Sequence, residues 1–409
     1  MPSGMQTRLS SSRDPSIQRD YAGSGLELTK VRVLDIACIL YLASTPWERF
    51  TLFGQITPVQ ITGVLYLSTY IVTSLVGRRR KDRNSGAALA QFAILLVAVW
   101  SALTSAWSVQ QDSSIATSIS IVFLALSSFA IGSSSSRQLP AMLASLTFGC
   151  TSLALLQLTN QFAGLKIGPL IDPNITAFNL CIGFAAALYL FSTSGRVLIR
   201  FIAAISTGVI VVGVLIQGSR TGLGGLVGIT LLSIILASSI KRRVLLGAGA
   251  ALGAALFIWL ETLGALPARL TTFLNNPNLD DPYLQSRSSI IDAFRELQPI
   301  WEIKGIGVGA DADFLALASG WYRNAHSLFW KVWIETGFVG LALWVIMLAA
   351  IARAALNSPA RLFLIISLGY VVPFMYDLGP AQANTLWVLI GLALMARPLH
   401  DVAAESVKG

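Results

Sequence analysis

The feature that most constrains this chain is a series of apolar segments, each about as long as a membrane is thick. An α-helix needs roughly 17–25 mostly apolar residues to cross the hydrocarbon core of a bilayer. Such segments follow one another from residue 31 almost to the end of the 409-residue chain, of which 54% is hydrophobic and only 12% charged. A soluble globular protein carries about 25% charged residues. The sequence therefore predicts an all-α, polytopic membrane protein.

We expect about twelve transmembrane helices, because that many segments reach or approach the required length. In the eighth segment, Gly224 and Gly228 have the spacing of two small residues on one helix face, which predicts close packing against a neighbouring helix. The predicted helices lie at 31–47, 57–76, 86–107, 113–133, 140–159, 174–194, 197–217, 220–239, 243–261, 325–351, 359–376 and 382–397.

The predicted chain has five parts. Residues 1–30 are polar and rich in Ser and Arg, and we expect them to form a disordered cytoplasmic tail. Residues 31–261 hold transmembrane helices one to nine. Residues 262–324 form a large extracytoplasmic loop, and long loops usually carry function. Residues 325–397 hold the last three transmembrane helices, and residues 398–409 form a second cytoplasmic tail.

The basic residues indicate the orientation of these helices. If the N-terminus is cytoplasmic, 20 of the 29 lysines and arginines fall in inside segments, as the positive-inside rule requires. An even number of helices then places both termini in the cytoplasm. The net charge of +9 is therefore a signal of topology. We expect a lipid bilayer around the chain and no nucleic-acid partner.

The large loop contains one clear amphipathic segment at residues 287–300. Ile290, Ile291, Phe294 and Leu297 fall on one face of a helix there. Such a helix is expected either to lie on the membrane surface or to cap the bundle.

Several kinds of site find no support in the sequence. It contains no HExxH, no cluster of His and Cys, and no GxSxG motif, so no metal or cofactor is expected. Asp311 and Asp313 form an isolated DxD pair, which is a weak indication of divalent-cation binding. Gly305, Gly307 and Gly309 resemble part of a nucleotide loop, but no βαβ unit surrounds them, and a flexible turn is expected.

Polar residues at three helix starts suggest an anion site. With a cytoplasmic N-terminus, each even-numbered helix begins at the outer surface and points its positive N-terminal end there. Helix six begins near Asn174, helix eight at Ser219 and Arg220, and helix ten at His326. His326 is one of two histidines in the chain and is a candidate general base. We hypothesise that these starts converge to bind an anion.

Further candidates lie close to these positions in the sequence. Arg287 begins the amphipathic loop helix and is a second candidate for binding an anion. Arg323 is a weaker one, because acidic residues of the loop could pair with it. Asp377, between helices eleven and twelve, could orient a sugar or a histidine. Lys331 and Glu335 are four residues apart on helix ten and are expected to form an ion pair.

Four short motifs follow one another in a characteristic order. They are Gly218-Ser-Arg-Thr-Gly222, Ser286-Arg287 with Gly305-Ile-Gly307, Ala325-His-Ser-Leu328, and Glu335-Thr-Gly-Phe-Val-Gly340. In this respect the chain resembles the O-antigen ligase family and the related O-antigen polymerases, over most of its length. In that family an asparagine usually follows the histidine, whereas here Ser327 follows it and Asn324 precedes it.

The resemblance implies a glycosyltransferase of the bacterial inner membrane whose active site faces away from the cytoplasm. Its donor would be a glycan on undecaprenyl pyrophosphate, and its acceptor a hydroxyl of a glycan or a lipid core. By motif position, Arg220 and Arg287 would bind the pyrophosphate and His326 would activate the acceptor, with no metal or cofactor. Asn174, Ser219, Arg323 and Asp377 are further possible substrate-binding residues. In-line displacement would invert the anomeric centre.

Two alternatives stay open at this point. An O-antigen or exopolysaccharide polymerase would use the same chemistry with a second lipid-linked glycan as acceptor. A flippase for lipid-linked glycans would line an inner cavity with basic residues along several helices. Here the basic candidates lie at the outer edge of the predicted bundle, which favours an enzyme.

Overall fold

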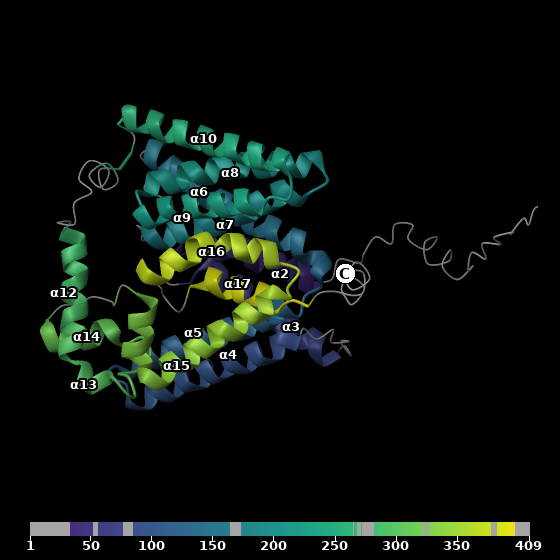
Figure 1. Cartoon of the computed structure of the whole chain (residues 1–409). Coiled ribbons are helices and arrows are strands. Elements are labelled where there is room, and N and C mark those ends of the chain that lie inside the picture. The colour runs from purple at the N-terminus through teal and green to yellow at the C-terminus, as the bar shows by residue number, and fades with distance from the viewer. Residues whose placement is uncertain are drawn as a thin grey trace, which may run out of the picture.

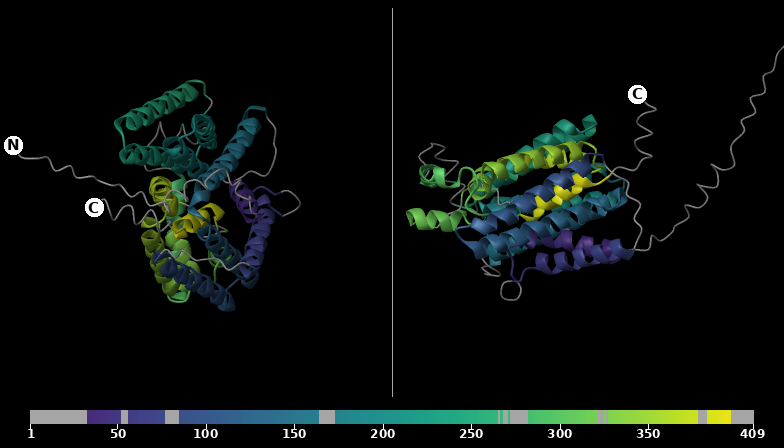
Figure 2. Two further views of the ribbon diagram at one scale, coloured as in Figure 1. Left: turned by 90° about the vertical axis from the view of Figure 1, so that its right-hand side faces the viewer. Right: turned by 90° about the horizontal axis from the view of Figure 1, so that it is seen from below.

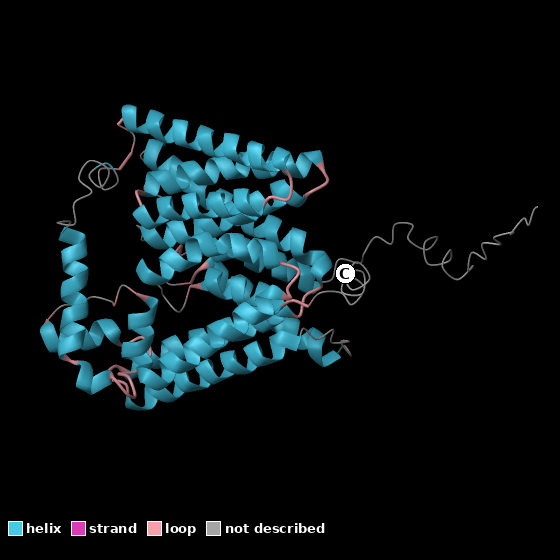
Figure 3. Ribbon diagram, in the orientation of Figure 1, coloured by secondary structure: helices cyan, strands magenta, loops and turns pink. Residues whose placement is uncertain are grey.

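The chain is helical throughout the part that the structure describes. The computed structural model describes residues 33–51, 56–76, 85–163, 173–264, 266, 267, 271, 282–320, 322, 325, 327–377 and 383–396. Within these residues helices are joined by short loops, and no strand is present (Figure 3). The predicted all-α membrane fold is therefore confirmed.

Each predicted membrane helix corresponds to a helix of the structure, and these helices form one bundle (Figure 1). Among the described helices, seven are long and apolar enough to cross a membrane, and four further apolar ones are shorter. The number of crossings therefore stays a prediction. The bundle consists of α2 (Val33–Ser44), α3 (Pro58–Val76), α4 (Ser85–Thr104), α5 (Gln111–Gly132), α6 (Leu139–Ala163), α7 (Pro173–Thr193), α8 (Val197–Gln217), α9 (Arg220–Leu236), α10 (Ile240–Thr262), α15 (Leu328–Leu356), α16 (Arg361–Asp377) and α17 (Asn384–Leu394).

Helix α7 lies in the interior of the bundle and α10 at its edge. Nearly all residues of α7 are buried, because α6, α8, α9 and α16 pack around it. Helix α10 lies at the edge of the bundle in Figure 1 and packs mainly on α9. Most of its apolar side chains are exposed. Exposed apolar side chains suit a helix that faces lipid, since lipid tails are as apolar as leucine.

Helices α9 and α16 approach each other closely at two glycines. A Cβ atom on Gly228 would lie 2.5 Å from the carbonyl oxygen of Gly369, and one on Gly225 would lie 1.8 Å from the ring of Tyr370. The sequence predicts this contact for Gly224 and Gly228, but Gly224 has open space around it. The prediction is correct for Gly228 and wrong for Gly224, because Gly225 is the residue that faces α16.

Three short helices lie beyond the end of the bundle at which α7, α9 and α15 begin (Figures 1 and 2). They are α12 (Pro282–Glu296), α13 (Gln298–Trp301) and α14 (Asp311–Ser319). Together with residues 328–336 of α15 they form a unit that we call the cap. The predicted amphipathic helix is α12, and its apolar face packs inside the cap. The side chains of this core are Ile290, Phe294, Trp301, Ile306, Ala310, Phe314, Leu315, Ala325 and Ile334, with Trp330 and Trp333 against them.

Helix α15 is broken at Gly337, whose φ of 69° and ψ of −174° are not helical. The break releases the backbone carbonyls of the preceding turn, those of Ile334, Glu335 and Thr336. Two of them accept hydrogen bonds from backbone N–H groups of the loop between α13 and α14, and the third accepts one from the indole of Trp100, at 2.8 to 3.1 Å. Backbone groups at membrane depth need such partners inside the protein, because lipid offers none.

The loop between α13 and α14, residues 302–310, is tightly packed. Gly305, Gly307 and Gly309 all have positive φ, and a Cβ atom on any of them would lie 2.2 or 2.3 Å from an atom of a neighbouring element. The expectation of a flexible turn is therefore wrong. These glycines allow the loop to enter the space between the break in α15 and the start of α5.

Replacing Gly337 by alanine should destabilise the protein. The new Cβ would lie 2.1 Å from the carbonyl oxygen of Ile303. A φ of 69° with a ψ of −174° is also a backbone conformation essentially restricted to glycine, which costs another residue on the order of 1–3 kcal/mol. Gly320→Ala is the matched control, because Gly320 has a φ of 76° but open space around its Cβ position. In detergent, the melting temperature should fall further in Gly337→Ala. Equal decreases would contradict a role for this close contact.

Candidate functional site

The starts of α7 and α9 meet at the end of the bundle that carries the cap. Helix α8 is followed by Gly218, with a φ of 62°, and Ser219 then caps α9 by accepting a hydrogen bond from the N–H of Gly222 at 3.1 Å. The Ser219 hydroxyl donates to Oδ1 of Asn174, in the first turn of α7, at 2.8 Å. Both side chains are buried. Two of the three helix starts expected to converge are therefore in direct contact.

Arg220 is the first residue of α9 and is partly buried beside this contact. Its Nε atom is shielded from solvent. The guanidinium thus belongs to a place where the N-termini of two helices meet. Free N–H groups and the positive ends of helix dipoles favour an anion there, and the planar guanidinium matches two phosphate oxygens.

The structure describes the other predicted site residues only in part. Arg287 belongs to α12, and Asp377 is the last residue of α16, but both side chains lie outside the described residues. His326 and Arg323 lie outside the described residues altogether. Their roles therefore stay predictions.

Helix α15 begins later than expected. Its first residue is Leu328, with Ser327 as the N-cap, whereas the sequence predicts a start at residue 325. The helix therefore follows His326 and does not include it. The side chain of Ser327 makes no capping hydrogen bond.

Three charged side chains are buried together where the cap joins α15. The Nζ atom of Lys331 lies 2.7 Å from Oδ1 of Asp311 and 2.6 Å from Oε1 of Glu335. The exposed fractions of the Asp311, Lys331 and Glu335 residues are 1%, 7% and 1%. The predicted pair of Lys331 and Glu335 is thus confirmed, and Asp311 of α14 is a third member that the sequence does not predict.

Asp311 also holds the chain ahead of α15. Its Oδ2 atom accepts a hydrogen bond from the N–H of Ala325 at 2.9 Å. One carboxylate therefore fixes Ala325 and Lys331, which stand on either side of His326 in the sequence.

The charge state of Asp311 follows from these contacts. Burial would raise the pKa of Asp311, but the ammonium of Lys331 and the hydrogen bonds to the carboxylate lower it below its usual value. Both carboxylate oxygens are engaged within the protein. Asp311 thus uses its two oxygens for Lys331 and Ala325, and the weak indication of a cation site at Asp311 and Asp313 stays untested.

A polar network that the sequence analysis missed lies around Glu48. Oε2 of Glu48 accepts hydrogen bonds from the backbone N–H and from Nδ2 of Asn384, each at 2.9 Å, at the start of α17. Oε1 accepts one from Nδ2 of Asn179 in α7 at 3.3 Å, and Thr385 donates to Oδ1 of Asn179. The carboxylate thus lies at the positive end of α17. An acid ending one apolar segment and an amide inside another are the signals that could have identified it.

A hollow beside these residues lies between α3 and α5 and reaches the start of α17. Its volume is about 520 Å³, within the range of about 300–1,000 Å³ that is typical of ligand sites. It is lined by Glu48, Arg49, Val59, Gln60, Val64, Ser113, Ala116, Thr117, Ile119, Ser120, Phe123, Leu124, Ala383 and Asn384.

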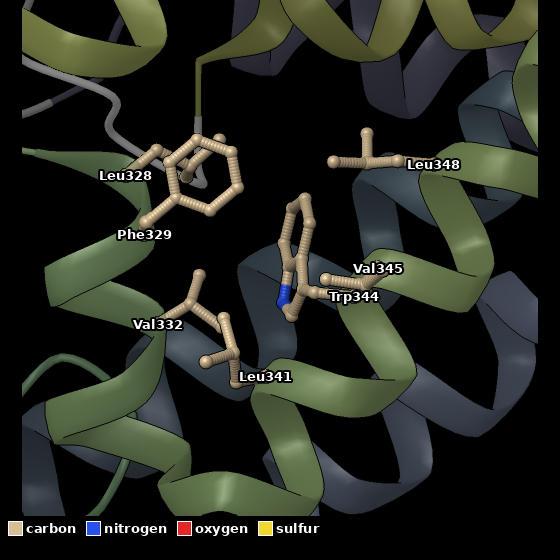
Figure 4. A pocket seen from close by; sticks show the side chains of 7 residues that line it. All are labelled: Leu328, Phe329, Val332, Leu341, Trp344, Val345 and Leu348. Carbon is tan, nitrogen blue, oxygen red and sulfur yellow. The ribbon is translucent and has the colours of Figure 1, made fainter.

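A second, much smaller hollow lies along α15 on both sides of its break (Figure 4). Its volume of about 10 Å³ is close to that of about one water-sized probe, so it cannot hold a substrate. The apolar side chains that face it are Leu328, Phe329, Val332, Leu341, Trp344, Val345 and Leu348.

Residues 204–345 match a protein-family model that is described as O-antigen ligase. The match begins within α8 and ends within α15, so it includes the start of α9, the cap and the buried charges. None of the curated proteins compared with the chain matches it.

Replacing Asp311 by asparagine should destabilise the protein at neutral pH, on the order of 3 kcal/mol, because it breaks a buried charge cluster. A carboxyl group whose pKa is lowered by folding stabilises the protein above its unfolded-state pKa, about 3.9, and loses this effect as pH falls through the folded-state pKa. The difference in melting temperature between wild type and Asp311→Asn should therefore narrow below about pH 4.

The partly exposed Asp313, on the same helix, supplies the control. Asp313→Asn should change the melting temperature little. A gap between wild type and Asp311→Asn that stays constant down to pH 3 would contradict the ionised state of Asp311.

Proposed function

We propose that the chain transfers a glycan from undecaprenyl pyrophosphate to an acceptor hydroxyl, which the match of residues 204–345 to the O-antigen ligase family model supports. The reaction takes place on the outer face of the bacterial cytoplasmic membrane and contributes to a cell-surface polysaccharide. In this topology both termini are cytoplasmic, and the cap lies on the outer face.

The observation that carries this proposal is the contact between the starts of α7 and α9. Ser219 and Asn174 join these helix ends, and Arg220 follows Ser219 directly. A pyrophosphate needs positive charge and hydrogen-bond donors at the moment it departs. Stabilising charge that develops in the transition state is usually the largest single contribution to catalysis.

The cap supports the proposal that Arg287 and His326 act at the same end of the protein as Arg220. Arg287 belongs to α12, within the cap, and His326 immediately precedes Ser327, the N-cap of α15. The cap lies over the end of the bundle at which α9 begins (Figure 1). Arg220 of α9 and Arg287 of α12 therefore belong to elements at one end of the protein, and Ser327, the neighbour of His326 in the sequence, begins α15 at the same end.

The chemical step is a displacement at the anomeric carbon of the donor. The acceptor oxygen forms a bond to this carbon as the bond from carbon to pyrophosphate oxygen breaks, so the electron pair leaves with the lipid pyrophosphate. His326 accepts the proton of the acceptor hydroxyl. Arg220 and Arg287 bind the departing pyrophosphate. Attack opposite to the leaving group inverts the anomeric configuration.

The buried charges support this arrangement indirectly. Asp311 contacts Ala325 and Lys331, which precede and follow His326 in the sequence. Catalytic groups need neighbours that hold them in a productive geometry.

Arg220→Lys should lower kcat/KM for the lipid-linked donor by about 10- to 100-fold, because a lysine keeps the charge but loses the two-pronged contact. The rate of glycan transfer in proteoliposomes measures this. Lys304→Gln is the control, since Lys304 is exposed in the cap loop and should have no effect. An unchanged rate in Arg220→Lys would mean that Arg220 only anchors the helix end at the interface.

His326→Ala should lower kcat by about 10²- to 10⁴-fold, the usual contribution of a general base, while donor binding is retained. The other histidine of the chain, His400, provides the control, and His400→Ala should be fully active. Both rates come from the same transfer assay, with donor affinity measured separately. Normal turnover by a folded His326→Ala protein would refute the proposed base.

A further inference from the structure

Five basic side chains lie at the end of the bundle opposite to the cap. Arg196 and Arg200 are at the start of α8, and Lys241, Arg242 and Arg243 are in the first turn of α10. These two helices are neighbours, and both begin at the end away from the cap (Figure 1). All five residues are exposed. Together they form a positively charged surface, which we call the basic patch.

No acidic residue balances the basic patch within the described part of the chain. None of its members belongs to an ion pair there, and neither helix has an acid in its first turn. Arg200 and Arg243 each donate a hydrogen bond from Nε to a backbone carbonyl, that of Ser194 at 2.6 Å and that of Ala237 at 3.2 Å. These acceptors are neutral, and each uses one of the five N–H donors of a guanidinium. The patch therefore keeps its charge and most of its donors for an anion.

Helix surface without a protein neighbour extends from the basic patch toward the middle of the bundle. Leu215 of α8 and Leu260 of α10 pack in one buried cluster close to the cap. Seven residues before each of them, on the same helix face, are Gly208 and Gly253. No atom of another helix lies within 4 Å of the Cβ position of Gly208, Gly249 or Gly253. The described part of the chain therefore leaves the surface at these three glycines open, and we call it the α8–α10 face.

The length of the α8–α10 face matches one leaflet of a bilayer. Arg243 and Gly253 are ten residues apart, or about 15 Å along the helix axis, which is half the thickness of roughly 30 Å of the hydrocarbon core. Large apolar side chains flank the face, since Phe201 of α8 and Leu245 of α10 are 62% and 54% exposed. A molecule with an anionic head and a hydrocarbon chain of this length fits these features.

Two other occupants fit these features less well. A free phosphate would use only the basic patch and would leave the apolar surface uncovered. A second copy of the chain has the same orientation in the membrane, so a contact through this face would bring two basic patches together, and like charges repel each other. An anionic phospholipid instead places its phosphate in the patch and an acyl chain on the face. Basic clusters at the ends of transmembrane helices attract such head groups.

We propose that the α8–α10 face binds an anionic phospholipid of the membrane leaflet opposite to the cap. Its phosphate contacts the basic patch at the starts of both helices, and one acyl chain lies along Gly208, Gly249 and Gly253. In the proposed topology this leaflet is the cytoplasmic one. The inference goes beyond the proposed function, because the site is at the other end of the bundle from the residues proposed for glycan transfer.

Native mass spectrometry of the full-length protein, released from detergent, tests the site with three probes. They are dioleoyl phosphatidylglycerol, dioleoyl phosphatidylcholine and glycerol phosphate. Phosphatidylcholine has the same phosphate and acyl chains but no net charge, and glycerol phosphate is the head group without chains. Phosphatidylglycerol should bind about ten-fold more tightly than either comparison probe, because only this lipid can use both the patch and the face.

A triple variant of α10 tests the basic patch. Lys241→Gln/Arg242→Gln/Arg243→Gln should weaken the binding of phosphatidylglycerol by about 10- to 100-fold, because each basic residue next to an anionic lipid contributes to binding. The binding of phosphatidylcholine should stay as it is in the wild type.

A second triple variant is the matched control. Arg137, Arg353 and Arg361 are exposed at the same end of the bundle but on other helices or loops. Arg137→Gln/Arg353→Gln/Arg361→Gln removes the same charge from that end and should leave the affinity for phosphatidylglycerol close to that of the wild type.

Two tryptophan variants of α10 test the apolar part of the site without changing any charge. Gly253 lies on the α8–α10 face, whereas Ala251 is exposed on another side of the same helix. Gly253→Trp should weaken the binding of phosphatidylglycerol by about 5- to 10-fold, because the indole occupies the place of the acyl chain. Ala251→Trp should leave this affinity unchanged.

Four results would overturn the inference. Equal losses of affinity in the two triple variants would mean that general charge at this end attracts the lipid. Equal affinities for phosphatidylglycerol and either comparison probe would remove the need for a site with both a charged and an apolar part. Unchanged lipid binding by Gly253→Trp would exclude an acyl chain from the face. A lipid-free dimer that Gly253→Trp disrupts would assign the face to a second copy of the chain.

Discussion

The break in α15 is the constraint on which the arrangement of this protein depends. A helix that is interrupted near a membrane leaves carbonyl groups that lipid cannot satisfy. Here Ile334 and Glu335 receive their hydrogen bonds from Ile306 and Gly307 of the cap loop, and Phe338 donates to the carbonyl of Glu302. The cap is therefore attached to the bundle by backbone hydrogen bonds. It cannot move far from α15 without exposing polar groups.

This attachment fixes the position of the cap at the end of the bundle. The first part of α15 packs Ile334 with Trp330 and Trp333 in the core of the cap, and Leu328 and Val332 in the core of the bundle. The part after Gly337 packs in the bundle. Asp311 of α14 is joined to Lys331 and Glu335 of α15 through buried charge. On the other side of this end, Asn174 and Ser219 bring two positive helix ends together beside Arg220. Backbone hydrogen bonds join the cap to α15, and two helix N-termini meet beside one guanidinium at the same end of the bundle.

Much of this architecture can be predicted from the sequence, because lipid imposes simple rules. Long apolar segments must be helices, and each predicted segment is one. The amphipathic pattern of α12 and the ion pair between Lys331 and Glu335 both follow from the 3.6-residue period of the α-helix. Each depends on residues that are only a few positions apart in the sequence. The contact between the starts of α7 and α9 agrees with the hypothesis that polar helix starts converge, although the sequence spacing alone does not show which starts meet.

What the sequence does not reveal depends on contacts between distant segments. In the sequence, Asp311 resembles the other acidic residues of the loop. Only the fold brings Asp311, the first residue of α14, into contact with Lys331, twenty residues later in the chain. The local sequence around Gly305, Gly307 and Gly309 predicts a flexible turn. Side chains are excluded at these positions because atoms of segments far away in the sequence lie too close. Gly337 looks like an ordinary glycine in an apolar helix, because the loop that occupies its break lies about thirty residues away. Glu48 and Asn384 are 336 residues apart.

The most direct test of the central claim is the anomeric configuration of the product. Purified protein in proteoliposomes would receive a polyprenyl-pyrophosphate glycan of known configuration and a defined glycolipid acceptor. NMR coupling constants of the new linkage would then report its stereochemistry. A single displacement assisted by one base predicts transfer with complete inversion. A product with retained configuration, or no transfer from this donor to any hydroxyl acceptor, would contradict the account.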